Sequence, residues 1–299
     1  MRGSSGAVST ALKLIPLLAS VLLLALLFKR IGLEKLISAL SRARLSTLLV
    51  ALGIDIPFVL LKSCKWLRTG RLGMRELKFK EAVSSFLIGV GASLLTPTQL
   101  GELARAVPFK GERKEAFILA FIDKLIDLSG LLFLFVISAL IWRPVIGIPM
   151  GLMWLMGACV GLWILRSKAS PVFLISQFVI SLACFLLLSF QFYAILLNFG
   201  EIRFADAFIG MPVVILSGMA PLTVGGLGLR EMTASVVLPR FGIGGAESAA
   251  SSLLLFAVNG LAIGIPGVIL GWSLIIRALG EKGGGDEADT GAIVQMASE

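Results

Sequence analysis

The sequence predicts an all-α polytopic membrane protein with about six spanning helices and two re-entrant hairpins, arranged as two inverted repeats. The first observation is composition: of 299 residues, 57% are hydrophobic and 15% are charged, and the mean hydropathy is +0.97. Soluble domains carry about 25% charged residues. The second observation is a series of long apolar stretches separated by short basic segments. The third is a pair of Pro- and Gly-containing breaks, TPTQLGELAR at 96–105 and PLTVGGLGLRE at 221–231.

The spanning helices are predicted from apolar stretches near the about 20 residues that a helix needs to cross a bilayer. The first has a basic start and no small-residue cleavage site after it, so we expect a retained anchor. Residues 29–44 are expected to form an amphipathic connector, and residues 62–80 a strongly basic loop. The predicted helices cover residues 14–28, 45–61, 116–142, 145–165, 172–197 and 249–276.

Two further apolar stretches, residues 82–95 and 207–220, are too short to cross the bilayer at about 1.5 Å per residue. Each leads into one of the two breaks and is followed by a short segment with charged residues. Polar backbone at bilayer depth is costly unless it is buried in protein or lines a cavity. The sequence therefore predicts two re-entrant hairpins, at 82–109 and 207–238.

The two halves of the chain resemble each other. LKFKEA, which begins at Leu77, is similar to IRFADA at Ile202, and at the same spacing Arg105 aligns with Arg230. Each half then holds three spanning helices and one hairpin, and an odd number of crossings inverts the second half. The alternative is chance similarity between two apolar halves. The predicted units are a first repeat at 1–142, a second repeat at 143–279 and a disordered cytoplasmic tail at 280–299.

Basic residues indicate the orientation. With the N-terminus inside, the inner segments carry about twice as many Lys and Arg as the outer ones, so both termini are expected in the cytoplasm, with the protein in the cytoplasmic membrane. The formal charge of +9 is then explained by topology and by anionic lipids rather than by nucleic acid. Histidine is absent, which removes the usual general base and the commonest metal ligand. The three cysteines lie in apolar stretches and are expected to be small buried hydrophobic residues.

Charged residues in or beside the membrane segments are the candidate site residues, because a charge near the bilayer centre costs roughly 2.5 to 3.5 kcal/mol and so faces a partner or a water-filled cavity. A helix that begins at a break directs its N–H groups at the tip, and an arginine one turn later favours an anion such as phosphate. The predicted substrate-binding residues are Thr98, Glu102, Arg105, Lys124, Asp127, Arg230 and Glu231. No catalytic or metal-ligating residue is predicted.

Each candidate has an expected role. Arg105 and Arg230 are expected to bind one phosphate, with Glu102 and Glu231 orienting them. Lys124 and Asp127 are expected to pair or to relay protons. The alternative is that all these charges only neutralise one another and lock the hairpins in place.

The order of these motifs resembles the lysylphosphatidylglycerol synthase transmembrane-region family. The resemblance covers roughly residues 10–280 and implies a flippase-like integral membrane protein that moves an anionic lipid, either an aminoacylated phospholipid or a polyprenyl-phosphate carrier. Synthase members also carry a soluble aminoacyl-transferase domain, and the chain ends roughly twenty residues after its last predicted helix, which implies that it lacks that activity. The motifs are Pro97, Gly101-Glu102, Arg105, Lys124, Asp127, Pro221, Gly225-Gly226, Gly228 and Arg230-Glu231.

A flippase-like transporter is therefore the expected function. The alternatives are an intramembrane lipid-modifying enzyme, for which the lack of histidine excludes a histidine-based phosphatase and disfavours metal catalysis, and a scaffold that holds a cytoplasmic partner through the basic residues 62–80. The expected partners are a membrane lipid with an anionic head group and a coupling ion, proton or sodium. No cofactor is expected.

Overall fold

The computed structural model describes residues 4–74, 76–94, 96, 100–109, 112–220 and 222–281. Throughout these residues the secondary structure is helical, with no β-strand, which confirms the all-α prediction. Among them, five helices are long and apolar enough to cross a membrane. They are α3 (Leu45–Gly70), α5 (Arg113–Trp142), α6 (Pro144–Leu165), α7 (Pro171–Leu196) and the continuous segment Gly245–Ser273. The chain is a multi-pass membrane protein.

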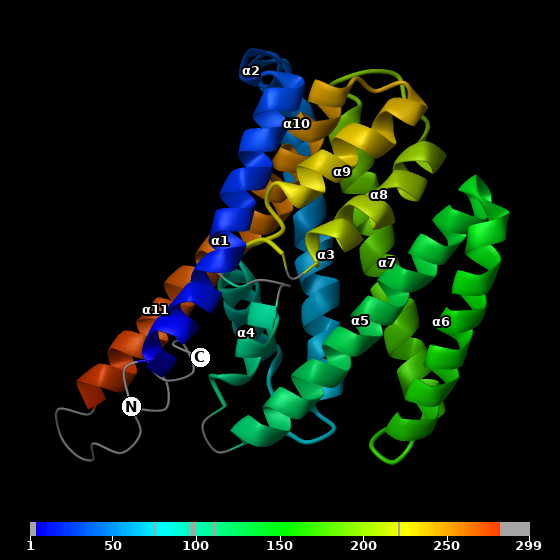
Figure 1. The fold of residues 1–299 in the computed structure, drawn as a ribbon. Helices are drawn as coiled ribbons and strands as arrows, with labels where there is room; N and C mark the ends of the chain where they lie inside the picture. Colours follow the sequence, from blue (N-terminus) through cyan, green and yellow to red (C-terminus); the bar gives the residue numbers. More distant parts are fainter. Residues whose placement is uncertain are drawn as a thin grey trace.

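A sixth crossing is available at the N-terminal end. Helix α1 (Ser4–Ile31) is followed after Gly32 by α2 (Leu33–Ser41), with a bend of 86° between them. The predicted connector at 29–44 thus contains the last turn of α1 and the short helix α2, which lies nearly perpendicular to α1. Figure 1 shows α2 at one end of the molecule, whereas the start of α1 and the last turns of α11 (Ala262–Glu281) lie towards the other end.

The predicted end of the second span is wrong. Helix α3 continues to Gly70, so Lys62 and Lys65 are helical and not part of a basic loop. Lys65 is fully buried. The helix can continue through these charges because two aspartates of α5 pair with them, as described below. Paired charges inside the protein do not have to reach water.

In both predicted hairpin regions, a short helix is followed by a loop, and the chain then turns back into a second helical segment. Helix α4 (Phe79–Ser93) packs against the 3₁₀ helix η1 (Leu100–Ala106), and α8 (Phe204–Gly218) packs against α9 (Leu229–Val237), which runs into a 3₁₀ turn η2 (Leu238–Phe241). The depth of these hairpins in a membrane stays a prediction, as does the inverted repeat. The predicted tip residues Pro97, Thr98 and Pro221 lie outside the described residues.

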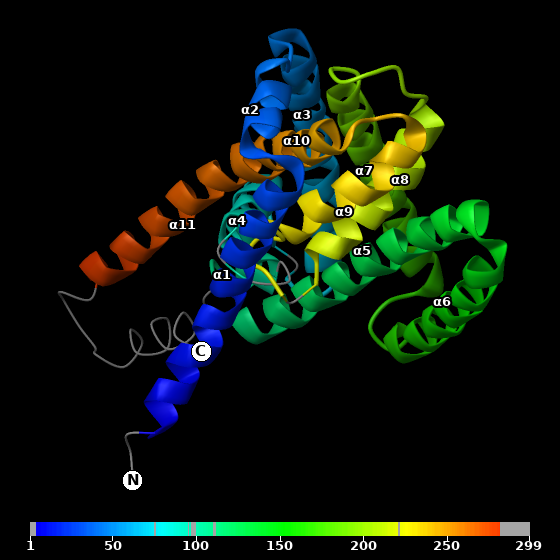
Figure 2. The same cartoon turned by 45° about the horizontal axis from the view of Figure 1, so that its top comes forward.

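The last crossing is one continuous helix that contains a π-helical segment. Helix α10 (Gly245–Leu255) passes through a π-helical segment η3 (Phe256–Leu261) into α11, which packs closely on α4. A Cβ added at Gly91 or at Gly267 would meet the backbone of the other helix, so only glycine permits this approach. The contact joins the first hairpin to the C-terminal part of the chain, and Figure 2 shows α11 running past α4 and outward. Gly280 and Glu281, the first two residues of the predicted tail at 280–299, are the last residues of α11, and 282–299 lie outside the described residues.

The main hydrophobic core lies between α3, α5, α7, α8 and α9, around side chains such as Leu131, Phe192 and Met211. Helix α6 is at the periphery and packs on α5 (Figures 1 and 2). The expectation that all three cysteines are buried is wrong for two of them: Cys184 is buried, but Cys64 and Cys159 are exposed. An apolar side chain that faces lipid does not need to be inside the protein.

Candidate functional site

A cavity of about 140 Å³ lies between the two hairpins and the continuous helix α10–η3–α11. Much of its wall is apolar, with aromatic side chains from α3, α4, α7 and η3. Three cations and two carboxylates also line it, so the charged lining has one positive charge in excess. These charged residues are Lys62, Glu102, Lys124, Asp127 and Arg230.

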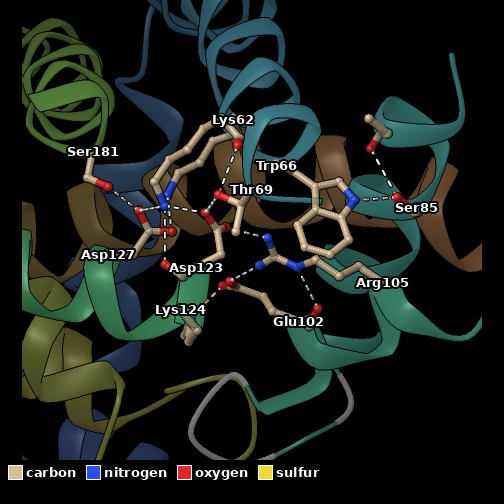
Figure 3. Close-up of polar contacts among 12 residues, drawn as sticks. Lys62, Trp66, Thr69, Ser85, Glu102, Arg105, Asp123, Lys124, Asp127 and Ser181 are labelled. Atoms are coloured by element: carbon tan, nitrogen blue, oxygen red, sulfur yellow. Dashed lines mark hydrogen bonds and ion pairs between the residues drawn. The ribbon is translucent and has the colours of Figure 1, made fainter. Parts of the chain in front are cut away.

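Arg105 of the first hairpin lies behind this cavity and does not line it. Its guanidinium is bound on two sides: Nη1 donates to Asp123 Oδ2 at 2.7 Å, and Nη2 to Glu102 Oε2 at 3.0 Å (Figure 3). It also lies over the ring of Trp66, 5.3 Å from the centroid, and only 1% of the residue is exposed. The indole of Trp66 in turn donates to Ser85 of α4 at 2.8 Å. Arg105 therefore fastens η1 to α3 and α5, and the prediction that it binds the ligand directly does not fit this position.

Two lysines of α3 meet two aspartates of α5. Lys65 Nζ lies 2.6 Å from Asp123 Oδ1 and 3.0 Å from Asp127 Oδ1, and Lys62 Nζ lies 2.7 Å from Asp127 Oδ2. Ser181 of α7 also donates to Asp127 Oδ1, at 2.6 Å (Figure 3). Asp127 was expected to pair with Lys124, but it is held by these α3 lysines.

Lys124 contacts the first hairpin instead. Its Nζ lies 2.7 Å from Glu102 Oε1, and both side chains line the cavity. Glu102 therefore has Arg105 on one oxygen and Lys124 on the other. The predicted orienting role of Glu102 toward Arg105 agrees with this geometry.

The pairing of Lys62, Lys65 and Asp123 was missing from the predicted site, although a signal for it exists in the sequence. The lysines are three residues apart and the aspartates four apart, so each pair lies along one helix face. Two apolar helices that each carry such a pair, of opposite sign, are expected to face each other. That signal identifies the α3–α5 contact but not its position beside the cavity.

Arg230 of the second hairpin has a different environment, because it lines the cavity. Within the described residues its one ion pair is with the adjacent Glu231, at 3.4 Å, close to the outer limit of a hydrogen bond. Its guanidinium lies over the ring of Phe256, 4.9 Å from the centroid. Phe256 thus positions the arginine without neutralising it.

Glu231 is fully buried and serves mainly to hold α9. Its Oε2 accepts from the backbone N–H of Gly228 at 2.6 Å, which caps the helix, and its Oε1 accepts from Ser252 of α10 at 3.1 Å. The loop before α9 has positive φ at Gly226 (75°) and Gly228 (87°), a conformation that favours glycine. The expected role of Glu231 in orienting Arg230 is therefore weaker than its role as a cap.

The structure brings four of the seven predicted site residues to one cavity: Glu102, Lys124, Asp127 and Arg230. Arg105 and Glu231 lie behind its wall, and Thr98 lies outside the described residues. The cavity adds Lys62, which the prediction did not include, and Asn259 of η3.

These features define a class: a helical, multi-pass membrane protein whose centre holds a charged cavity between two short hairpins. Comparison with known families identifies the particular one: the family model of the lysylphosphatidylglycerol synthase TM region matches residues 13–169, more than half of the chain. The chain belongs to this family, a family of membrane proteins that handle lipids. The match covers the first hairpin and the α3–α5 charge cluster, and it ends before Arg230. No curated protein matches the chain.

Proposed function

We propose that this protein moves an anionic, phosphate-bearing lipid across the cytoplasmic membrane. The lipid is an aminoacylated phospholipid or a polyprenyl-phosphate-linked lipid, and the protein acts as a transporter rather than as an enzyme. The observation that carries the proposal is Arg230, a weakly paired arginine in a cavity built by both hairpins.

Arg230 has the geometry of a phosphate-binding residue. Strong guanidinium–carboxylate bonds are about 2.7 to 2.9 Å long, whereas its contact with Glu231 is 3.4 Å. Both oxygens of Glu231 already accept other hydrogen bonds, from Gly228 and Ser252. A lipid phosphate in the cavity can therefore bind the guanidinium while Glu231 keeps its hydrogen bonds to Gly228 and Ser252.

The rest of the cavity suits a charged head group. Lys62 and Lys124 can add hydrogen bonds to a phosphate, and Glu102 and Asp127 can accept from an ammonium group of an aminoacylated lipid. At about 30 Å³ per water, 140 Å³ corresponds to roughly five waters, which is room for a phosphate group but not for acyl chains. Acyl chains that stay in the bilayer while the head group crosses are what a flippase requires.

The proposed topology has both termini in the cytoplasm. The bent pair α1–α2 and the five other candidate spans make up to six crossings, an even number. The start of α1 and the end of α11 point to the same end of the molecule (Figure 1). Lys65 and Arg105 are buried and no longer count as inner loop charges, but the remaining basic residues still favour the same orientation.

The test is lipid movement in reconstituted vesicles of phosphatidylcholine with a fluorescent phosphatidylglycerol. Wild-type protein should make the inner-leaflet probe accessible to an external quencher, and Arg230→Ala should abolish most of this exchange. Arg203→Ala is the matched control, since Arg203 is exposed and pairs with Asp206 outside the cavity. A chemically altered lipid formed by detergent-purified protein, with no exchange in vesicles, would support the enzyme alternative and overturn this proposal.

A further inference from the structure

A second polar cluster lies beside the central cavity, around Asp55 of α3, a residue only 7% exposed. Gln191 of α7 donates its Nε2 to Asp55 Oδ1 at 2.7 Å and to the carbonyl oxygen of Ala51 at 2.9 Å. Asn259 of η3 donates its Nδ2 to the same Oδ1 at 3.2 Å. Side chains of two other elements, α7 and η3, thus donate to one carboxylate oxygen of α3.

The other oxygen of Asp55 has no hydrogen-bond partner among the residues that the structure describes. Oδ2 is buried without a hydrogen bond, and so is Oε1 of Gln191. Among the described residues, no lysine or arginine forms an ion pair with Asp55, whereas Asp123 and Asp127 both bind lysines. A buried carboxylate without a cation is costly and is neutralised most simply by a proton. The protonated Oδ2–H would be a donor, and Gln191 Oε1 is an unused acceptor on a side chain already bound to Asp55.

We propose that Asp55 is a proton-binding site that couples lipid movement to a proton gradient. This inference rests on the proposed transport function. A proton from water on one side forms the O–H bond at Oδ2, that bond breaks to return the proton to water on the other side, and no electrons are transferred.

Asn259 provides the link between this site and the cavity. It lines the cavity and belongs to η3, the π-helical segment, a type of irregularity that is frequent at functional sites. Hydrogen bonds to a charged carboxylate are roughly twice as strong as neutral ones. Protonation of Asp55 therefore loosens the attachment of η3 to α3 and α7, and η3 continues into α11, which packs on the first hairpin.

The other ionisable groups on the elements packed around α3 do not replace Asp55. On α5, Asp123 and Asp127 are held by lysines and Lys124 by Glu102, and η3 has no ionisable residue. Those on α4 and α11 lie at the helix ends away from η3. The groups concerned are Lys62, Cys64, Lys65 and Arg68 on α3, Cys184 and Tyr193 on α7, Arg113, Lys114 and Glu115 at the start of α5, Lys80 and Glu81 on α4, and Arg277 and Glu281 on α11.

The first experiment measures the proton directly. Infrared difference spectra of detergent-purified protein between acidic and neutral pH should show a protonated carboxylic acid band that Asp55→Asn loses. Asp206→Asn is the matched control, because Asp206 pairs with the exposed Arg203, and it should keep the band. Equal bands in wild type and Asp55→Asn would overturn the proposal. If Asp55→Asn does not fold, wild-type protein can be treated with dicyclohexylcarbodiimide, which should modify Asp55 at acidic pH. Failure to find modified Asp55 among the peptides would equally overturn the proposal.

The second experiment measures coupling in the vesicles described above. A pH gradient should accelerate phosphatidylglycerol exchange by wild type and Asp206→Asn, and this acceleration should be lost in Asp55→Asn. Acceleration by a sodium gradient but not by a pH gradient would overturn proton coupling. If exchange by wild type is unaffected by either gradient, proton coupling is overturned but the transport function is still supported. No exchange at all, with the infrared band present, would instead contradict the transport function.

Discussion

The two hairpins carry the same motif, a glycine-containing break followed by an arginine, yet the two arginines have opposite surroundings. Arg105 is 1% exposed, bound by Glu102 and Asp123 and stacked on Trp66. Arg230 lines the cavity and has one carboxylate neighbour at 3.4 Å. Arg105 is paired with two carboxylates at 2.7 and 3.0 Å, whereas Arg230 has one longer ion pair and lines the cavity.

The difference teaches that the motif does not decide the role of its arginine. The deciding factor is the set of carboxylates that other helices bring to it. Helix α5 supplies Asp123 to Arg105, and no helix in the described part of the chain supplies a comparable partner to Arg230. Of the two predicted alternatives, the contacts of Arg105 favour hairpin locking, and ligand binding by Arg230 stays a proposal.

The largest expected effect is that of Arg105→Ala on stability. It leaves Glu102 and Asp123 short of a cation in a buried site, and breaking such a pair costs about 3 to 5 kcal/mol. We expect a strong fall in the thermal unfolding temperature in detergent and in the yield of folded protein. A normal unfolding temperature combined with weak lipid binding would contradict the structural role of Arg105, because it would place Arg105 in the ligand site.

The next effect is that of Arg230→Ala on binding. A charge-assisted hydrogen bond contributes about 1.5 to 3 kcal/mol, so phosphatidylglycerol should bind roughly ten- to a hundred-fold more weakly, as measured by fluorescence titration. Stability should fall less than in Arg105→Ala, because the buried Glu231 loses only a weak ion pair of 3.4 Å and keeps its hydrogen bonds to Gly228 and Ser252. A loss of stability as large as that of Arg105→Ala would show that both arginines are structural.

Arg230→Lys should have a smaller effect and sharpens the assignment. Lysine keeps the charge but cannot make the two-pronged contact of a guanidinium, so we expect a loss of roughly tenfold or less relative to wild type. The same titration measures it. Binding as weak as that of Arg230→Ala would indicate that the geometry of the fork, rather than the positive charge, holds the lipid.

The smallest effect is expected for Arg203→Ala. Arg203 is exposed and its pair with Asp206 faces water, so neither the unfolding temperature nor lipid binding should change measurably. A clear decrease in lipid binding would mean that surface charge near α8 attracts the lipid, and the cavity assignment would lose its specificity.

Much of the fold could be predicted because it depends on local properties. The length and hydropathy of each apolar stretch are enough to predict whether it can cross a bilayer, and each Pro- and Gly-containing break interrupts the helix in which it lies. For this reason the six predicted spans all correspond to helices in the structure. The error at the end of α3 has the opposite cause: Lys62 and Lys65 resemble loop residues until their partners on another helix are known.

The sequence by itself determined that this is a helical membrane protein of a lipid-handling family, with several charges within its membrane segments, although it placed Lys62 and Lys65 in a loop. Only the tertiary structure decided how those charges pair. Lys62 is 65 positions from Asp127, Asn259 is 204 positions from Asp55, and Arg230 lines the same cavity as Glu102 of the first hairpin. In a medium of low dielectric, a charge or hydrogen bond is satisfied by whichever group is nearest in space, and helix packing rather than position in the chain places that group.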